Sequence, residues 1–339
     1  MSRGSVPSIG MVGVGNWGKN HLRNFASLTS CRLGGICDRD PAVLARVREE
    51  HPDVFVTDDF DALLARPDID AMVIASSAVT HAPLGVQALE SGRDVFLEKP
   101  MALSSKDGEA ILRAAEKKDR IVMVGHLLLY HPAVEYLKSL VDEGELGDLH
   151  YIYSERVNLG AIRSDENAMW SFAPHDLSIV GLLFDEQPES VSARGGCYVQ
   201  ESIEDVVFLN VKYPSGRTAQ IHVSWLDPHK IRKTTLVGSK KMAVFDDMEP
   251  AEKIRIYDKG VDTPQFVSYD QAPALRFGDI VIPQLKMKEP LRIECQHFVD
   301  CVRERKRPRT DGESGLTVVR ILEAGQRSLE RGGEPIRIG

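Results

Sequence analysis

The chain shows one pattern of hydrophobic residues up to about residue 127 and a different pattern after it. Before that point, short and almost continuous apolar runs alternate with segments in which apolar residues recur every three to four positions. This alternation predicts a parallel sheet covered by helices on both faces. The expected strands are residues 9–15, 32–38, 53–57, 71–76, 94–99 and 121–125. The expected helices are residues 16–28, 41–51, 59–65, 80–91 and 105–118.

Beyond residue 127, most segments alternate between apolar and polar positions, and few helical segments separate them. That pattern is typical of a large, mainly antiparallel sheet. Strands are expected at residues 150–159, 190–199, 205–214, 218–226, 231–239 and 241–247, and helices at 132–144, 291–306 and 312–329. We therefore expect an α/β protein with a doubly wound first domain (residues 1–127) and a second domain (residues 128–339).

The bulk composition is that of a globular protein, with 42% hydrophobic and 27% charged residues. A net charge of −8 gives no reason to expect nucleic acid or an anionic membrane as a partner. No apolar run is long enough to span a bilayer, and residues 1–8 do not resemble a signal peptide, so we expect a cytoplasmic protein. Five dispersed cysteines without a CxxC motif indicate reduced thiols and no metal site.

A glycine motif follows the first expected strand, in the sequence Gly13-Val14-Gly15-Asn16-Trp17-Gly18. Between a strand and a helix, such glycines allow a tight turn and let a dinucleotide's pyrophosphate approach the helix N-terminus. Asp38, twenty-three residues after Gly15, stands where a carboxylate is expected to bind the cofactor's ribose. This favours NAD. Because Arg39 could accept the extra phosphate of NADP, that cofactor is not excluded.

Further polar residues stand at the ends of the later strands of the predicted parallel sheet. The carboxyl ends of parallel strands meet at one edge, which is where ligands bind. The residues expected there are Ser76, Ser77, His81, Glu98, Lys99 and His126. Glu98 and Lys99 could form a salt bridge at the rim, but neighbouring strand residues point to opposite faces.

These stretches resemble the glucose–fructose oxidoreductase, inositol dehydrogenase and rhizopine catabolism (Gfo/Idh/MocA) family. The resemblance rests on GVGNWG (13–18), CDRDP (37–41), IASSAVTH (74–81), GRDVFLEKPMAL (92–103) and VGH (124–126). It implies that Lys99 contacts the nicotinamide ribose and the reacting hydroxyl, and that Glu98 lies beside the cofactor. It also implies C-terminal helices that pack back toward the nucleotide domain, and a homodimer or homotetramer that buries the open sheet.

The segment MWSFAPHDLSIVGLLF (169–184) contains the second candidate catalytic residue, His175. Pro174 favours a helix that begins at this point, with His175 and Asp176 at its positive end. A helix N-terminus disfavours the imidazolium, and a neutral imidazole suits a general base. The family commonly has an aspartate four residues before this histidine, but Ser171 stands there. Whether Asp176 replaces it is left open, and a capping role for the pair is the alternative.

Candidate substrate residues cluster upstream of His175, in what reads as a loop that leaves a strand. Arg156 and Arg163 suit a diphosphate beside a nicotinamide pocket, because each guanidinium can bind phosphate oxygens bidentately. We interpret the nearby Glu166 as a solvated surface charge. Trp170 could stack on a sugar or seal the core. The full candidate set is Tyr153, Arg156, Asn158, Arg163, Asp165, Trp170, Asp176 and Trp225.

Three stretches resemble one branch of the family, the nucleotide-sugar 3-dehydrogenases: residues 17–25, 156–176 and 222–230. The resemblance implies NAD-dependent oxidation of the C3 hydroxyl of UDP-N-acetylglucosamine. The 3-keto product would pass to a partner aminotransferase, in 2,3-diamino-sugar synthesis for lipid A or surface polysaccharide. The alternatives are UDP-N-acetylglucosaminuronate, an inositol or another sugar as substrate, and a non-catalytic NAD-binding regulator.

Overall fold

The computed structural model describes residues 6–262 and 274–339. The chain divides into two compact units, which we describe separately. Unit 1 comprises the residues up to Tyr130 together with Lys288–Arg320, and unit 2 comprises His131–Met287 and Ile321–Gly339. The range 128–339, expected to form one domain, is therefore shared between the two units.

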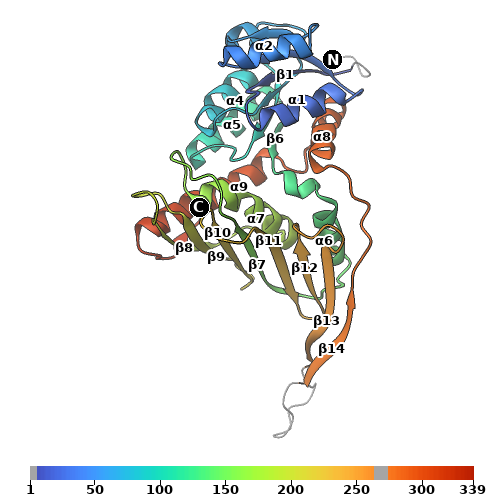
Figure 1. The fold of residues 1–339 in the computed structure, drawn as a ribbon, viewed down its shortest axis with the longest axis vertical. Helices are drawn as coiled ribbons and strands as arrows, with labels where there is room; N and C mark the ends of the chain where they lie inside the picture. The colour runs from blue at the N-terminus through green and yellow to red at the C-terminus, as the bar shows by residue number, and fades with distance from the viewer. Residues whose placement is uncertain (1–5, 263–273) are drawn as a thin grey trace. The chain divides into compact units, whose positions relative to one another are not determined.

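Unit 1 is built on a six-stranded parallel sheet with the strand order β3-β2-β1-β4-β5-β6 (Figure 1). Its strands are β1 (Ser8–Val12), β2 (Arg32–Cys37), β3 (Phe55–Thr57), β4 (Ala71–Ile74), β5 (Asp94–Glu98) and β6 (Val122–Gly125). The intervening helices are α1 (Gly18–Ser27), α2 (Pro41–Glu50), α3 (Phe60–Leu64), α4 (His81–Glu90) and α5 (Ser105–Lys118), with short 3-10 turns η1 (Ala78–Thr80) and η2 (Leu127–Tyr130). The predicted doubly wound sheet is confirmed.

Local sequence signals fix where several of these helices begin. Asp40, Asp59 and Ser104 accept hydrogen bonds from backbone N–H groups in the first turns of α2, α3 and α5. α8 (Pro290–Glu304), from the C-terminal part of the chain, packs against α1. Their contact is part of an aromatic core in which Phe298 lies against Phe25 and Phe96.

Unit 2 is built on a nine-stranded sheet with the order β14-β13-β12-β11-β7-β10-β9-β8-β15. The strands are β7 (Leu149–Val157), β8 (Ser190–Gly196), β9 (Val206–Lys212), β10 (Thr218–Ser224), β11 (Ile231–Gly238), β12 (Met242–Asp246), β13 (Ile254–Asp262), β14 (Ala274–Val281) and β15 (Ile336–Arg337). Among the described strands of this sheet, only β7 and β10 pair in parallel, so the expectation of a mainly antiparallel sheet is confirmed. β13, β14 and β15 were not predicted from the sequence.

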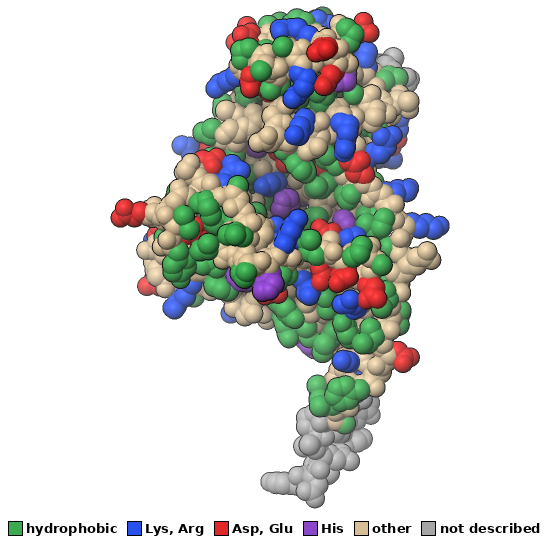
Figure 2. Space-filling view, viewed as in Figure 1, with side chains coloured by type: hydrophobic (Ala, Val, Ile, Leu, Met, Phe, Trp, Pro, Cys, Tyr) green, Lys and Arg blue, Asp and Glu red, His purple; other side chains and the backbone are tan. Residues whose placement is uncertain are grey.

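One face of this sheet is covered by α6 (Pro132–Asp142) and α7 (Ala168–Phe184), which contact its central strands. α9 (Gly312–Glu330) begins in unit 1 and ends in unit 2. The opposite face and the β13–β14 hairpin leave large apolar side chains exposed, among them Phe208, Leu275 and Phe277. Hydrophobic side chains gather at the described end of this hairpin in Figure 2. None of the described helices is long and apolar enough to cross a membrane.

Candidate active site

The glycine motif forms a turn at the end of β1 whose shape depends on having no side chains. Gly13 has a φ of +84°, and a Cβ on it would lie 2.8 Å from the backbone of Ala75. A Cβ on Gly18 would collide with the carbonyl of Gly13, whereas one on Gly15 would meet open space. α1 starts here without a side-chain cap, and the backbone N–H groups of Lys19 and Asn20 in its first turn donate to the carbonyls of Gly15 (3.2 Å) and Trp17 (2.8 Å). The turn therefore fits a dinucleotide's pyrophosphate.

A cavity of about 500 Å³ lies beside this turn, at the carboxyl ends of several parallel strands. It brings together six residues predicted to bind the cofactor: Gly13, Gly15, Asp38, Arg39, Ser76 and Ser77. Asp38 accepts hydrogen bonds from the backbone N–H groups of Val14 (2.6 Å) and Asp40 (2.9 Å). The predicted ribose-binding carboxylate is thus tied to the glycine turn itself. Asp58 and Asp59 also line the cavity, and the sequence interpretation missed both.

His81, predicted to bind the cofactor, has a structural role in unit 1. Its ring is buried, with Nδ1 2.8 Å from the carbonyl oxygen of Pro100 and Nε2 3.1 Å from that of Ser76. Burial lowers the pKa of this imidazole. A neutral imidazole has one N–H and can donate to only one of these two carbonyls, so the ring packs between two strand-end turns, and its contact with a cofactor stays a prediction.

Glu98 lies at the centre of a hydrogen-bonded network around the end of β5. Its Oε1 accepts from the indole Nε1 of Trp17 (2.7 Å) and lies 2.6 Å from Nε2 of His21, and its Oε2 accepts from the backbone N–H of Lys99 (3.0 Å). Burial acts to raise the pKa of Glu98, but the hydrogen bond and charge of His21 hold it below its ordinary value. This carboxylate links the glycine turn, α1 and the Lys99 turn.

His21 was missed from the sequence, although its spacing gave a usable signal. It follows Trp17 by four residues, so both side chains lie on one face of α1. On its other side, Nδ1 lies 3.7 Å from Sγ of Cys295 in α8. Burial raises the pKa of this thiol well above its ordinary value, so it stays protonated.

His126 lies directly after β6 and is almost fully buried. Among the described residues, neither of its ring nitrogens has a hydrogen-bond partner. Burial lowers the pKa of His126 to about 4, so the ring is neutral at pH 7. This neutral imidazole is buried at the strand end and does not line the cavity beside the glycine turn, so its contact with the cofactor stays a prediction.

In unit 2, His175 does not stand at a helix N-terminus, contrary to our expectation. α7 begins at Ala168, and Asn167 caps it by accepting a hydrogen bond from the backbone N–H of Trp170 (3.1 Å). Pro174 lies inside the helix, and the half-buried His175 is about two turns from its start. The helix dipole therefore does not account for a neutral His175. The assignment of His175 as the general base stays a prediction.

Two predicted substrate residues, Arg156 on β7 and Asp176 on α7, form a buried ion pair. Nε of Arg156 lies 2.6 Å from Oδ2 of Asp176, and Nη2 lies 3.2 Å from Oδ1. The two charges neutralise each other, and the assignment of both residues to the substrate site stays a prediction. The pair fixes α7 against β7 at the residue next to His175.

The remaining loop candidates also have partners within unit 2. The amide oxygen of Asn158 accepts a hydrogen bond from the half-buried Arg232, a residue not predicted for the site. Arg163 is exposed and pairs with Asp165 (3.0 Å) and with Glu166 (2.8 Å), which was expected to be simply solvated. Trp170 is half-buried in the first turn of α7 and is not in a loop.

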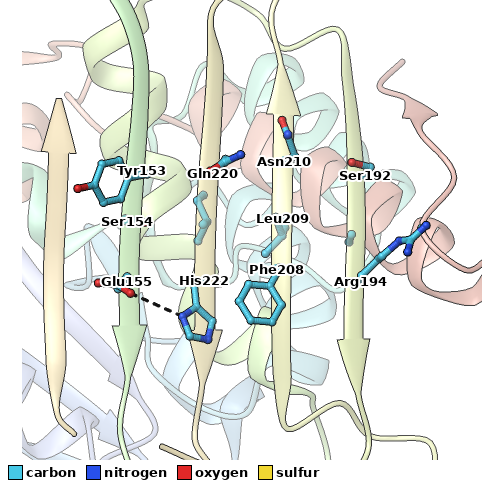
Figure 3. A pocket seen from close by; sticks show the side chains of 13 residues that line it. Tyr153, Ser154, Glu155, Ser192, Arg194, Phe208, Leu209, Asn210, Gln220 and His222 are labelled. Atoms are coloured by element: carbon cyan, nitrogen blue, oxygen red, sulfur yellow. Dashed lines mark ion pairs between the residues drawn. The ribbon is translucent and has the colours of Figure 1, made fainter. Parts of the chain in front are cut away.

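Trp225 and Tyr153 do not join these residues. Trp225 is fully buried, and its indole N–H donates to Asp205 (2.6 Å), so it is a core residue. Tyr153 alternates with Arg156 along β7 and projects from the opposite, open face of the sheet. There it lines a cavity of about 420 Å³, together with Phe208 and His222, whose rings stack 4.3 Å apart (Figure 3). Neither assignment to the substrate site is supported.

Comparisons with known proteins agree with this architecture. Residues 8–126 match the model of the oxidoreductase family with an NAD-binding Rossmann fold, Gfo/Idh/MocA, and residues 134–244 match the Gfo/Idh/MocA C-terminal domain. The UDP-N-acetylglucosamine 3-dehydrogenase of Acidithiobacillus ferrooxidans is 25% identical over 91% of this chain and 93% of its own. The structure of that enzyme superposes with a TM-score of 0.83 over 96% of this chain and 98% of its own, at 24% identity.

Two further relatives bind other compounds. The scyllo-inositol 2-dehydrogenase (NAD(+)) of Bacillus subtilis is also 25% identical, over 88% of this chain and 86% of its own. The WlbA dehydrogenase of Bordetella pertussis, solved with NADH and UDP-GlcNAcA, has a TM-score of 0.80 at 21% identity, with 99% of each chain covered. With both domain models matched in order, this chain belongs to the Gfo/Idh/MocA family and is an NAD-binding dehydrogenase.

Proposed function

We propose that the protein oxidises the C3 hydroxyl of UDP-N-acetylglucosamine to a ketone, with NAD+ as the oxidant. The observation that carries this proposal is the full-length match, in sequence and in fold, to a UDP-N-acetylglucosamine 3-dehydrogenase. The cofactor cradle of unit 1 is consistent with it, because Gly13, Gly15 and Asp38 line one cavity at the sheet edge.

The proposed chemistry removes a hydride from carbon and a proton from oxygen of the same alcohol. The nicotinamide ring supplies the hydride acceptor when the cofactor is bound. We assign the proton to the imidazole of His175 and electrostatic stabilisation of the developing alkoxide to the ammonium of Lys99. Glu98 supports this role, because its carboxylate holds the backbone N–H of Lys99 and the indole of Trp17.

A second candidate is a different cyclic alcohol processed by the same groups. The inositol dehydrogenase relative is as similar in sequence, and the WlbA structure holds a uronate sugar nucleotide. Arg163 favours an anionic substrate, because its guanidinium is exposed and pairs with the exposed carboxylate of Asp165 and the partly exposed carboxylate of Glu166. A carboxylate or a diphosphate would both meet this condition. A regulator that binds NAD without turnover is the third, non-enzymatic candidate.

The test is turnover by the purified full-length protein with NAD+ and each substrate at equal concentration. We expect NADH formation, and the highest kcat/KM with UDP-N-acetylglucosamine. A coupled aminotransferase, which we propose as the physiological partner, would draw the reaction forward by consuming the ketone. A higher kcat/KM with the uronate or an inositol would reassign the substrate, and tight NAD+ binding with no turnover would support the regulator.

We also propose that the open face of the nine-stranded sheet is covered by a second copy of this chain, in a dimer or tetramer. Aromatic side chains exposed on that face, Tyr151, Tyr153 and Phe208, support this assignment. The register places the exposed residues Leu275 and Phe277 of the hairpin on the same face. Phe208→Glu should therefore convert the oligomer seen by light scattering into monomers, and an unchanged mass would refute this arrangement.

A further inference from the structure

We infer that Arg232 and Asn158 bind an anionic oxygen of the substrate, from a phosphate or a carboxylate, next to the proposed base His175. Arg232 lies near the start of β11, and Asn158 directly follows β7. The inference rests on the proposed oxidation of a sugar nucleotide. It adds the residues of this chain that recognise the negative charge of that substrate.

Two arginines stand opposite each other across the pairing of β7 and β11. Arg232 is opposite Arg156 in the register, and residues directly opposite in antiparallel strands project from the same face of the sheet. Like charges in this arrangement are unfavourable unless another group compensates them. Asp176 compensates one of them, because its carboxylate accepts two hydrogen bonds from Arg156 (2.6 and 3.2 Å). The three side chains together therefore leave one positive charge, that of Arg232.

The hydrogen bonds of Arg232 do not neutralise this charge, because its acceptors are neutral. Within the part of the chain that the structure describes, its N–H groups donate to the backbone carbonyls of Val157 and Ile231 (2.8 Å each) and to the amide oxygen of Asn158. These bonds use three of the five N–H donors of the guanidinium. The half-buried side chain thus keeps both its charge and donors for a ligand.

The surroundings of Arg232 favour the addition of a negative charge. Burial and the charge of Arg156 both lower the pKa of its guanidinium, whereas Asp176 and Asp247 act in the opposite direction. Both carboxylates already have cationic partners, since Asp176 pairs with Arg156 and Asp247 lies 3.4 Å from Nζ of Lys253. An anion bound by Arg232 would therefore offset the cost of its burial and the repulsion from Arg156.

Asn158 adds further donors to the same site. Because its Oδ1 accepts from Arg232, its Nδ2 is the atom left to bind a ligand, and in the described ranges this N–H2 group has no acceptor. The two side chains together present only N–H donors, from one charged group and one neutral group. Such a surface favours an anionic oxygen, which accepts several hydrogen bonds, over a neutral hydroxyl.

The site lies on the accessible side of α7, close to His175. Over residues 171–180 of this helix, every side chain is buried except those of Phe172 and His175. These two residues are three positions apart, so they share one side of the helix. The guanidinium of Arg232 lies over the ring of Phe172, 5.4 Å from its centroid. An anion held by Arg232 would therefore place the attached sugar near the imidazole that we propose as the base.

The test is calorimetric binding to the full-length protein saturated with NADH, which cannot accept a hydride, so neither ligand is consumed. The ligands are UDP-N-acetylglucosamine, whose charge is on the diphosphate, and UDP-N-acetylglucosaminuronate, which carries a carboxylate as well. We expect Arg232→Gln to raise the Kd of one or both about 10- to 100-fold. An equal loss for both ligands identifies the diphosphate as the bound anion, and a larger loss for the uronate identifies the carboxylate.

A second variant, Asn158→Asp, separates anion binding from a purely structural role of Arg232. It keeps the size of the side chain and an oxygen that accepts from Arg232, so the fold should be preserved. It also replaces the amide donors by a carboxylate that neutralises the guanidinium, so the Kd of the same ligands should rise at least as much as in Arg232→Gln.

The matched control is Lys233→Gln, which removes a positive charge from the next position of β11, on the opposite face of the sheet. There its ammonium pairs with Asp246 (3.1 Å), so this variant should change neither Kd. Affinity for NADH should be the same in all three variants. Unchanged Kd values in Arg232→Gln or in Asn158→Asp would overturn the inference alone. If neither ligand binds the unmodified protein, the inference fails together with the proposed substrate.

Discussion

Arginines, aspartates and histidines occur both at the edge of the parallel sheet in unit 1 and in the β7–α7 segment of unit 2. The two regions differ in how the charges of these residues are compensated. At the sheet edge, the carboxylates of Asp38 and Glu98 are held mainly by backbone N–H groups and aromatic rings. In β7–α7, the charges of Arg156 and Asp176 cancel each other in a buried pair. The first arrangement leaves the charge of Asp38 facing a cavity, whereas the ion pair of the second stabilises the fold.

A charged residue near a catalytic one can therefore be assigned to substrate binding only when its partner within the protein is known. Arg156 satisfied the expectation for diphosphate binding by residue type and position, yet its guanidinium is bidentate to an internal carboxylate. Burial of a charge is tolerated when it is paired, so the sequence neighbour of a base is often such a partner.

The largest effects should come from the two proposed catalytic residues. Lys99→Met and His175→Ala should each lower kcat by about 10²–10⁴-fold, because each removes a group that acts on the developing alkoxide. Affinity for NAD+ should stay within a few-fold in both. Steady-state rates and calorimetric titration of the same preparations test this, and an unchanged kcat in either variant would remove that residue from the mechanism.

The second prediction concerns the buried ion pair of unit 2. Asp176→Asn should lower the free energy of unfolding by about 3–5 kcal/mol, because it leaves the guanidinium of Arg156 buried without its counter-charge. The double variant Arg156→Met with Asp176→Leu should lose much less. Urea denaturation of the three proteins tests this. If the single variant is as stable as the wild type, the ion pair does not stabilise the fold, and Arg156 becomes a candidate for substrate binding.

The sequence predicted much of unit 1 because its signals are local. Nearly continuous apolar runs mark the strands, and glycines mark a turn that no side chain fits, so the Gly13 cradle and Asp38 could be placed in advance. The position of His81 between two backbone carbonyls could not be predicted, because these carbonyls come from turns that only the folded chain brings together.

In unit 2, two competing local signals produced the error at His175. Pro174 favours a helix start, but Asn167 supplies a side-chain cap about two turns earlier, and burial of the apolar residues between them favours the longer helix. Trp225 and Tyr153 were misplaced for a different reason. Which face of a strand an alternating residue occupies depends on the sheet's pairing, and that pairing joins segments far apart in the chain.

The third prediction is a pH dependence that originates in unit 1. The pKa of His126 is about 4 in the folded protein and about 6.5 in the unfolded chain, so below pH 6.5 the unfolded state binds the extra proton. Its contribution to stability is complete above pH 6.5 and is lost as pH falls from 6.5 to 4. His126→Leu removes this loss, which reaches about 3 kcal/mol. Unfolding free energies of both proteins, measured from pH 7.5 to 5, should therefore converge or cross on acidification; parallel curves would contradict the assignment.

The smallest effect on stability is expected at Arg163, and it sharpens the distinction between paired and available charges. Its ion pair with Asp165 is on the surface, where such pairs contribute about 0–1 kcal/mol, and its partner Glu166 is half-buried. Arg163→Ala should therefore leave the midpoint of thermal unfolding almost unchanged. If the guanidinium leaves these carboxylates to bind the substrate's diphosphate, the same variant should raise KM for the nucleotide sugar about tenfold with kcat unchanged. The reason is that the lost contact binds the ground state and the transition state equally. Asp165→Asn is the control, since it frees the guanidinium and should lower KM or leave it as it is. An unchanged KM in Arg163→Ala would show that Arg163, like Arg156, forms ion pairs within the protein and does not bind the substrate.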